Sequence, residues 1–224
     1  MTPGMGAIRA VIFDLDGTLV DSTPSHVSSW LEACELAGLP RVPRELVEGL
    51  MGRTSHDIAA EILRAVGRDR SLARELAELK DRLFAEKYAE RVPLIEGARE
   101  VLRELKAVGI KVCVVSSNPR ELILRVLRAT GLSSYVDAVV GQDEVERGKP
   151  DPAPILLALA RLSARPNEAA VVGDSVYDVL AAKRAGVAAV GITRSDEVRR
   201  EMLRSGASAV VGSIREIVGL VINR

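Results

Sequence analysis

Two acidic residues, Asp14 and Asp16, follow a short apolar run near the start of the chain. The run at 10–13 holds no polar residue, which is typical of a strand buried on both faces of a parallel sheet. Ligands of open α/β sheets bind beside the carboxyl ends of strands, so both carboxylates are expected at a binding crevice. Gly17 lets the chain turn there and approach a ligand closely, and the Thr18 hydroxyl can fix that turn by a hydrogen bond. The stretch suits a cation together with an anionic substrate.

The same D-L-D-G stretch also fits an ordinary surface turn, because Asp and Gly are common turn residues. Polar partners at other strand ends favour a binding site instead. Ser116, Ser117 and Asn118 follow an expected strand at 110–115 and immediately precede a helix. Hydroxyls and amides beside a helix N-terminus form a seat for phosphate. Ser and Asn are also favoured helix caps, which is the alternative interpretation of these three residues.

A lysine and two further carboxylates follow later in the chain. Lys149 lies in the loop G-K-P-D-P, where the following proline favours an extended backbone and a fixed ammonium group. A solvated loop lysine is the alternative. Asp174 follows an expected strand at 169–172, and Asp178 lies in the first turn of the next helix, where either could serve as a cap or a dipole partner. The coincidence of such residues at four strand ends predicts one site for Mg²⁺ and phosphate.

The elements around these residues predict an α/β fold. Apolar strands alternate with helices from Pro93 onward, which indicates a doubly wound parallel sheet. Strands are expected at 10–13, 110–115, 138–140, 169–172, 187–192 and 209–211, and helices at 98–108, 119–130, 153–162, 176–185, 196–205 and 214–221.

Between Pro24 and Pro93 the sequence has only helical patterns, at 25–37, 43–51, 54–66 and 72–89. The two prolines mark where the chain leaves and re-enters the sheet, which is the layout of an insertion. We therefore expect a Rossmann-like core domain of residues 1–20 and 93–224, with a small helical domain of residues 21–92 inserted into it.

Composition argues against several classes of protein. The chain has 31 Lys and Arg residues against 31 Asp and Glu residues, so nothing indicates a basic surface for nucleic acid. No apolar stretch approaches the roughly 18 residues of a membrane span, and residues 1–6 form a short lead rather than a signal peptide. We expect a cytoplasmic protein, a monomer or homodimer, that binds neither membrane nor nucleic acid. Cys34 and Cys113 are expected to be reduced and buried.

Four motifs occur in order along the chain: D-L-D-G-T at 14–18, Ser116 after a strand, Lys149 in G-K-P-D-P, and G-D-S-V-Y-D at 173–178. Together they resemble those of the haloacid dehalogenase superfamily over nearly the whole length. The helical insertion after the first motif is similar to that family's small cap domain. Within the superfamily the chain resembles the phosphoglycolate phosphatase and beta-phosphoglucomutase group. The resemblance implies Mg²⁺-dependent hydrolysis of a small phosphomonoester, such as phosphoglycolate or a sugar phosphate.

The resemblance also implies a role for each motif residue. Asp14 would be the nucleophile that forms an aspartyl-phosphate. Asp16 would protonate the leaving alcohol and later deprotonate water, while its backbone carbonyl reaches the metal. Mg²⁺ would be held by Asp14, the Asp16 carbonyl and Asp174, with Asp178 bound directly or through water. The phosphoryl group would be bound by Ser116, Ser117, Asn118, Gly17 and the charge-neutralising Lys149, with Thr18 and His26 in supporting roles.

Further residues bear on which reaction is catalysed. Dehalogenases of the superfamily lack the second carboxylate, so Asp16 argues for phosphoryl transfer. His26 and Trp30 resemble a pair found in beta-phosphoglucomutase and in related phosphatases, and packing within the cap is the alternative explanation for both.

The stretch 51–55 corresponds to a loop that selects substrate in these relatives. The mutase arginine for a second phosphate is missing, since Ser55 and His56 stand at that place. Arg53 either contacts a substrate carboxylate or phosphate or is a free surface arginine. The missing arginine weakens the case for a sugar-phosphate mutase, which is kept as the alternative enzyme. A catalytically silent protein that binds a phosphometabolite is the alternative of another class, and the intact acidic and lysine motifs argue against it.

Overall fold

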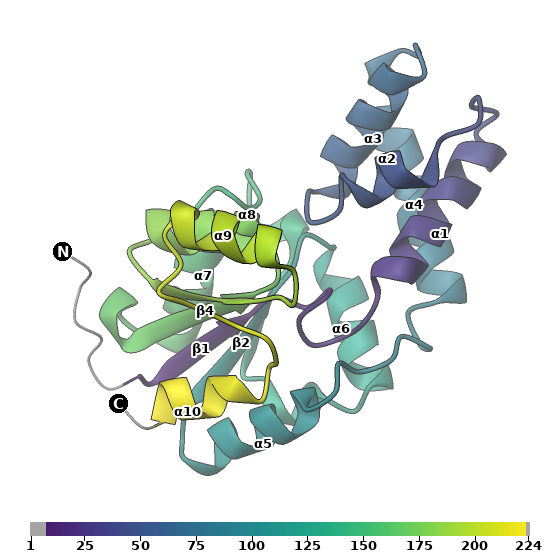
Figure 1. Cartoon of the computed structure of the whole chain (residues 1–224). Coiled ribbons are helices and arrows are strands. Elements are labelled where there is room, and N and C mark those ends of the chain that lie inside the picture. The colour runs from purple at the N-terminus through teal and green to yellow at the C-terminus, as the bar shows by residue number, and fades with distance from the viewer. Residues whose placement is uncertain (1–7, 223–224) are drawn as a thin grey trace.

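A six-stranded parallel sheet forms the centre of the computed structural model, which describes residues 8–222 (Figure 1). The strand order is β3-β2-β1-β4-β5-β6, so β1, the strand that ends at Asp14, is central. Both neighbours of β1 are parallel to it, with Ile12 beside Cys113 on β2 and Val171 on β4. The strands are β1 (Ala10–Phe13), β2 (Lys111–Val115), β3 (Ala138–Val140), β4 (Ala169–Gly173), β5 (Ala188–Ile192) and β6 (Ala209–Val211).

Helices cover both faces of the sheet, as a doubly wound topology requires (Figure 1). On one face α5 (Ala98–Ala107), α6 (Arg120–Ala129) and α10 (Glu216–Ile222) pack on Val11 and Phe13 of β1. On the other face α7 (Ala153–Leu162), α8 (Val176–Arg184) and α9 (Asp196–Ser205) pack on Ala10 and Ile12. Because successive residues of a strand point to opposite faces, an apolar run of four serves both cores.

Four helices between β1 and α5 lie apart from the sheet (Figure 1). They are α1 (Thr23–Leu36), α2 (Arg44–Glu48), α3 (Ser55–Ala65) and α4 (Ala73–Lys87), and they enclose an apolar cluster of their own around Trp30, Ile62 and Leu76. We call this unit the cap. The boundaries at 20/21 and 92/93 stay a prediction, although Asp21 N donates to Pro93 O across 2.9 Å where the two connections meet.

The expected fold class is confirmed, and the strands and helices differ from expectation by at most three residues at their ends. Ile110 and Val187 were expected to begin strands, but each closes the preceding helix: Ile110 N donates to Leu105 O and Val187 N to Ala182 O. Each follows a glycine of positive φ, the left-handed turn that commonly ends a helix.

Cys34 and Cys113 are free and buried, as expected. The expected lead at residues 1–6 lies outside the described residues. Within residues 8–222, the helices are all too short or too polar to cross a bilayer.

The packing of β1 gives a first prediction. Replacing Ile12, which is fully buried between β2 and β4, by alanine leaves a cavity and should lower the free energy of unfolding by about 2–5 kcal/mol. Urea titration followed by circular dichroism measures this. Leu156→Ala is the control, because Leu156 is 48% exposed and its change should stay within about 0.5 kcal/mol. Equal losses in both variants would contradict the central position of β1.

Candidate active site

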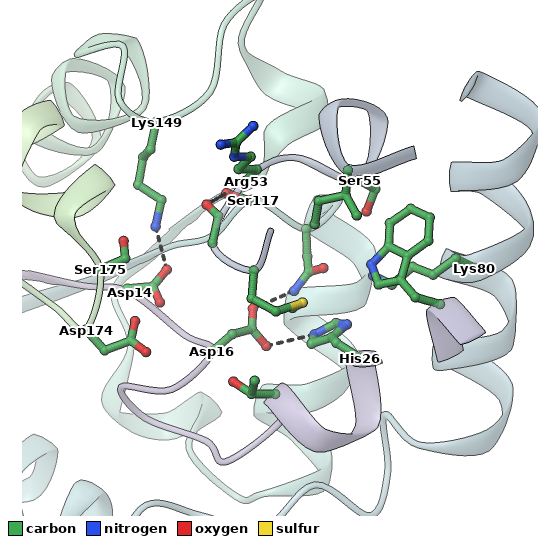
Figure 2. Close-up of a pocket in the computed structure, with 16 residues that line it drawn as sticks. Asp14, Asp16, His26, Arg53, Ser55, Lys80, Ser117, Lys149, Asp174 and Ser175 are labelled. Atoms are coloured by element: carbon green, nitrogen blue, oxygen red, sulfur yellow. Dashed lines mark hydrogen bonds and ion pairs between the residues drawn. The ribbon is translucent and has the colours of Figure 1, made fainter. Parts of the chain in front are cut away.

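A cavity of about 220 Å³ opens where the carboxyl ends of β1, β2 and β4 face the cap (Figure 2). Residues of the sheet side and residues of the cap share its wall. Its lining is Asp14, Asp16, Thr23, His26, Trp30, Met51, Gly52, Arg53, Ser55, Ile58, Lys80, Ser117, Asn118, Lys149, Asp174 and Ser175. The volume lies below the range of drug-sized ligand sites, so the cavity suits a small metabolite.

Lys149 joins two carboxylates at the base of the cavity. Its Nζ lies 2.6 Å from Asp14 Oδ1 and 2.6 Å from Asp178 Oδ1, and all three side chains are buried. Burial lowers the pKa of a lysine, but here the two carboxylates outweigh that effect and raise the pKa of Lys149, which therefore stays charged. The structure places the predicted lysine as a fixed buried cation and not as a solvated loop side chain.

Asp174 brings a third carboxylate to this place. One oxygen from each of Asp14, Asp174 and Asp178 lies within 4.8 Å of the others, which is close enough to hold one cation. Gly17 is required for this approach, since a Cβ at that position would lie 2.0 Å from Asp174 Oδ2 and the residue has a φ of +80°.

The charge balance of this group calls for a cation. Burial is the main cause that raises the pKa of Asp14 above its usual range, and burial together with Asp178 raises the pKa of Asp174 to about 7. One ammonium group does not balance three carboxylates. The all-oxygen donor set fits a hard divalent ion such as Mg²⁺ or Ca²⁺, which would lower both pKa values.

The carboxylate of Asp16 points away from this group and toward the cap (Figure 2). It accepts four hydrogen bonds, which come from Ser22 Oγ at 2.5 Å and His26 Nε2 at 3.0 Å on Oδ1, and from Ser116 Oγ at 3.0 Å and Asn118 Nδ2 at 2.6 Å on Oδ2. Burial by itself raises the pKa of Asp16, but His26 and these hydrogen bonds lower it below the usual range. In the absence of substrate Asp16 is therefore ionised.

The turn after β1 is formed differently from expectation. Thr18 was expected to fix it through its hydroxyl, and this prediction is wrong: Thr18 Oγ1 is buried with no hydrogen-bond partner among the described residues. Backbone bonds close the turn instead, from Gly17 N to Val20 O at 2.8 Å and from Leu19 N to Leu15 O at 2.9 Å. Leu15 and Leu19 are fully buried, so packing and backbone geometry suffice to hold it.

The capping alternative is correct for Asp178, whose Oδ2 accepts from Ser175 N at 3.1 Å at the start of α8. It does not describe Ser116, Asn118 or Asp174. The residue before α6 is Pro119, with no side-chain cap, while Ser116 Oγ accepts from Asn118 N at 3.1 Å and donates to Asp16. At α8 the cap is Ser175, whose Oγ accepts from Asp178 N. The side chains of Ser116, Asn118 and Asp174 are thus available to the site.

The cap contacts the sheet domain beside the cavity. Arg53 is half-buried, and its Nε donates to the hydroxyl of Tyr177 on α8 at 3.1 Å. Ser117 Oγ lies 3.5 Å from Gly52 O in the same loop. Arg53 is therefore a lining residue held by a partner and not a free surface arginine. Its head group projects between Lys149 and the cap (Figure 2).

Sequence reasoning missed Ser22, Lys80 and Tyr177. Lys80 is almost fully buried; its Nζ lies 3.0 Å from Asp81 Oδ1 and 5.4 Å from the centre of the Trp30 ring. A signal for Lys80 was present, since it lies four residues before Phe84 on the apolar face of a helix. Ser22 and Tyr177 gave no comparable signal, because their partners Asp16 and Arg53 are set by tertiary packing.

Comparisons with known proteins give matches over most of the chain. The family model described as haloacid dehalogenase-like hydrolase matches residues 11–192. A phosphoglycolate phosphatase of Yersinia pestis is 33% identical over 84% of this chain and 82% of its own length. The pyrophosphatase PpaX of Bacillus velezensis is also 33% identical, over 83% of both chains. The crystal structure of CbbY from Rhodobacter sphaeroides in complex with phosphate has a TM-score of 0.82 at 25% identity, covering 97% of this chain and 100% of that one.

The three carboxylates give a prediction for cation binding. Added Mg²⁺ should raise the melting temperature, by roughly 2–4 °C per kcal/mol of binding free energy. The rise should be larger at about pH 8.5 than at about pH 5.5, because Asp174, with its pKa raised to about 7, must lose its proton when the ion binds. Differential scanning fluorimetry measures both shifts. Asp174→Asn should reduce the rise, while Glu197→Gln on the exposed side of α9 should not. An equal rise at both pH values would contradict the assignment.

Proposed function

This chain belongs to the haloacid dehalogenase-like hydrolases and is a phosphatase of that family, and we propose that it hydrolyses a small phosphomonoester with Mg²⁺ through an aspartyl-phosphate on Asp14. One observation carries the proposal: Asp14 is held at one oxygen by the buried ammonium of Lys149, beside two further carboxylates and at the edge of a small cavity. Among the described residues no donor is bonded to its second oxygen, Oδ2, which is the atom that would attack phosphorus.

The proposed seat of the phosphoryl group is the polar end of β1, β2 and the Lys149 loop. Ser116, Ser117 and Asn118 supply hydroxyl and amide donors, Gly17 allows close approach of the backbone, and Lys149 offsets charge. The metal would be held by Asp14, Asp174 and the Asp16 backbone carbonyl, and Asp178 would bind it directly or through water. The bound ion would neutralise phosphoryl charge and keep Asp14 ionised. Arg53 faces the organic half of the ester.

The reaction then proceeds in two displacements. Asp14 Oδ2 forms a bond to phosphorus while the ester P–O bond breaks, and the leaving oxygen takes a proton from Asp16. Water next forms a bond to phosphorus while the bond between phosphorus and Asp14 Oδ2 breaks, and the water gives a proton to Asp16. Phosphate is released and the Asp14 carboxylate is restored. Each half needs Asp16 in a different protonation state, as acid first and as base second.

The four hydrogen bonds on Asp16 provide a way to change that state. Two of its donors, Ser116 and Asn118, are also the proposed phosphoryl ligands. If they turn to the phosphoryl oxygens, Asp16 loses two bonds that favour its ionised form and gains a dianion nearby, and both changes raise its pKa. Substrate binding would thus favour protonation of Asp16, which prepares it to act as the acid. His26 and Ser22 would keep the carboxyl oriented throughout.

The substrate is proposed to be a small phosphorylated metabolite, phosphoglycolate or a sugar phosphate. The names of two relatives, a phosphoglycolate phosphatase and a phosphorylated carbohydrates phosphatase, and the size of the cavity support this class. Thr18 would act only through packing. A monomer or homodimer in the cytoplasm stays a prediction from the sequence.

The nucleophile can be tested by removing one charge. Asp14→Asn should lower phosphate release below detection and abolish trapping of a labelled acyl-phosphate, with an unchanged circular dichroism spectrum, since the amide is a poor nucleophile of the same shape. Release is measured from phosphoglycolate, sugar phosphates, nucleotides and pyrophosphate, with Mg²⁺ and with EDTA.

Asp21→Asn is the matched control for that experiment, because Asp21 is exposed and lies outside the cavity lining. Retained activity in Asp14→Asn would remove the nucleophile assignment. Isomerisation of beta-glucose 1-phosphate with its bisphosphate, without phosphate release, would identify a mutase. Ligand binding without either reaction would support the alternative of a catalytically silent protein that binds a phosphometabolite.

Asp16 can be tested through the pH dependence of the rate. Asp16→Ala should lower kcat about 10²-fold to 10⁴-fold, the range for a positioned acid or base. Ser22→Ala, which removes only one donor from Asp16, should keep most of the rate and shift the Asp16 limb of the kcat profile, which reports the enzyme–substrate complex, to higher pH, because the lost bond raises the pKa of Asp16. An unchanged rate in Asp16→Ala would mean that another group carries the proton.

A further inference from the structure

The hydrogen bond between Arg53 and Tyr177 joins the cap to the first turn of α8. Arg53 lies in the loop between α2 and α3, and its Nε donates to the Tyr177 hydroxyl at 3.1 Å. The guanidinium carbon of Arg53 lies 6.0 Å from the centre of the Tyr177 ring. The loop backbone lies against the same ring, since a Cβ on Gly52 would be 3.4 Å from Tyr177 Cδ2. The ring therefore supports the loop, while the hydroxyl fixes one atom of Arg53.

The group that holds Arg53 carries no charge. A guanidinium has five N–H donors, and the Tyr177 hydroxyl accepts from the one on Nε. Among the described residues, no carboxylate forms an ion pair with Arg53, and its terminal nitrogens Nη1 and Nη2 donate to no protein oxygen. A carboxylate in place of the phenol would offset the positive charge and could bind two N–H groups at once. Arg53 thus keeps its full charge and both terminal nitrogens for a ligand.

A ligand in the catalytic cavity can reach those nitrogens. Arg53 is half-buried and lines the cavity, and its head group lies between Lys149 and Ser55 (Figure 2). The two terminal nitrogens of a guanidinium bind a carboxylate or phosphoryl group through parallel hydrogen bonds. Because Nε is already bonded to Tyr177, the pair Nη1 and Nη2 is the part of Arg53 that remains for such an anion.

Tyr177 is also part of the helix start that carries the acidic group. Asp174 precedes α8, and Asp178, the residue after Tyr177, lies 2.6 Å from Lys149 Nζ. The hydroxyl that holds Arg53 and the carboxylates of the proposed metal site therefore belong to one short stretch of chain. With the cap in contact with the sheet domain as in this structure, that stretch sets the distance from the phosphoryl seat to the terminal nitrogens of Arg53.

We propose that Tyr177 is a positioning residue, whose hydroxyl holds Arg53 so that the terminal nitrogens bind a second anionic group of the substrate. This inference rests on the proposed phosphatase function and deepens it. The substrate class that it selects is a small phosphoryl compound with a second anion, either a carboxylate or a further phosphoryl group, at a set distance from the first. Tyr177 acts on the substrate only through Arg53.

The test compares anionic substrates with neutral ones of similar length, using the full-length enzyme with Mg²⁺. The anionic probes are carboxymethyl phosphate, 3-carboxypropyl phosphate and pyrophosphate, and their neutral counterparts are ethyl, butyl and methyl phosphate. Tyr177→Phe keeps the ring beside Gly52 and removes the hydroxyl. For the anionic probe that the wild type prefers most, the ratio of its kcat/KM to that of its neutral counterpart should fall about 3-fold to 10-fold, mainly through KM.

Tyr135→Phe is the matched control, because Tyr135 lies outside the cavity lining and loses the same hydroxyl. The ratio should not change in this variant. A wild-type enzyme that prefers none of the anionic probes would contradict the proposal. If only pyrophosphate is preferred, the second anion is a phosphoryl group, and if only a carboxyalkyl phosphate is preferred, it is a carboxylate.

A double variant separates positioning from a purely structural role of Tyr177. Arg53→Gln should lower the ratio about 10-fold or more, because the anion loses a charge-assisted pair. Adding Tyr177→Phe to Arg53→Gln should cause no further fall, since Tyr177 acts through Arg53. Damage to α8 would instead lower kcat for anionic and neutral probes alike, because Asp174 and Asp178 lie at its start. Equal losses on both classes in Tyr177→Phe, or additive losses in the double variant, would overturn the proposal.

The two levels of inference fail separately. Absence of phosphate release by the wild-type enzyme from every probe would remove the phosphatase. Calorimetric titration of Asp14→Asn with the same probes would still give the ratio of affinities with and without the Tyr177 hydroxyl. A ratio that Tyr177→Phe leaves unchanged, in release or in binding, would remove only the role of Tyr177.

Discussion

The excess of buried negative charge at the end of β1 is the constraint on which the site depends. Carboxylates of Asp14, Asp174 and Asp178 share a space with one ammonium group, and burial strengthens their repulsion. Such a group persists only where surrounding packing holds it. Here the parallel sheet supplies that support, because three adjacent strands end at the same edge, and Gly17 removes the Cβ that would collide with Asp174. In the proposed complex, a divalent cation would neutralise charge on both the carboxylates and the phosphoryl dianion.

In the proposed mechanism, substrate binding and acid chemistry use the same hydrogen-bond donors. Ser116 and Asn118 stabilise ionised Asp16 in the structure, yet they stand where a phosphoryl group would need them. A carboxyl group that served only as an acid would be expected in an apolar setting, which favours the protonated form. In the proposed mechanism Asp16 also acts as a base, so hydrogen-bond partners that can be exchanged serve the two half-reactions better than fixed ones. The bonds from Ser22 and His26 on the other oxygen keep the group in position during the exchange.

Sequence reasoning predicted the sheet and its site edge well because both depend on local patterns. Apolar runs of strand length followed by Asp or Ser identify strand ends directly, and glycines of positive φ mark helix ends to within a few residues. Contacts between the cap and the core were not predictable in this way. The bond from Arg53 to Tyr177 joins residues 124 positions apart, and the Trp30, Lys80 and Phe84 cluster depends on how α1 packs on α4. The prediction for Thr18 was wrong for a different reason. Threonine can form a hydrogen bond, but at this position backbone hydrogen bonds already close the turn.

Substrate choice must therefore lie mainly in the cap. In the proposed mechanism the residues at the sheet edge bind the phosphoryl group and the cation and transfer the proton, and these tasks are common to the hydrolysis of any phosphomonoester. What remains to distinguish one ester from another is the cap wall, where Arg53 is held by Tyr177 and where His26 Nδ1 and Trp30 Nε1 lack partners among the described residues. The cap folds around its own apolar cluster, so residues on its cavity side can change without disturbing the sheet. Such a separation would let members of one family differ in substrate, and the relatives of this chain do carry different names, a phosphoglycolate phosphatase and a pyrophosphatase.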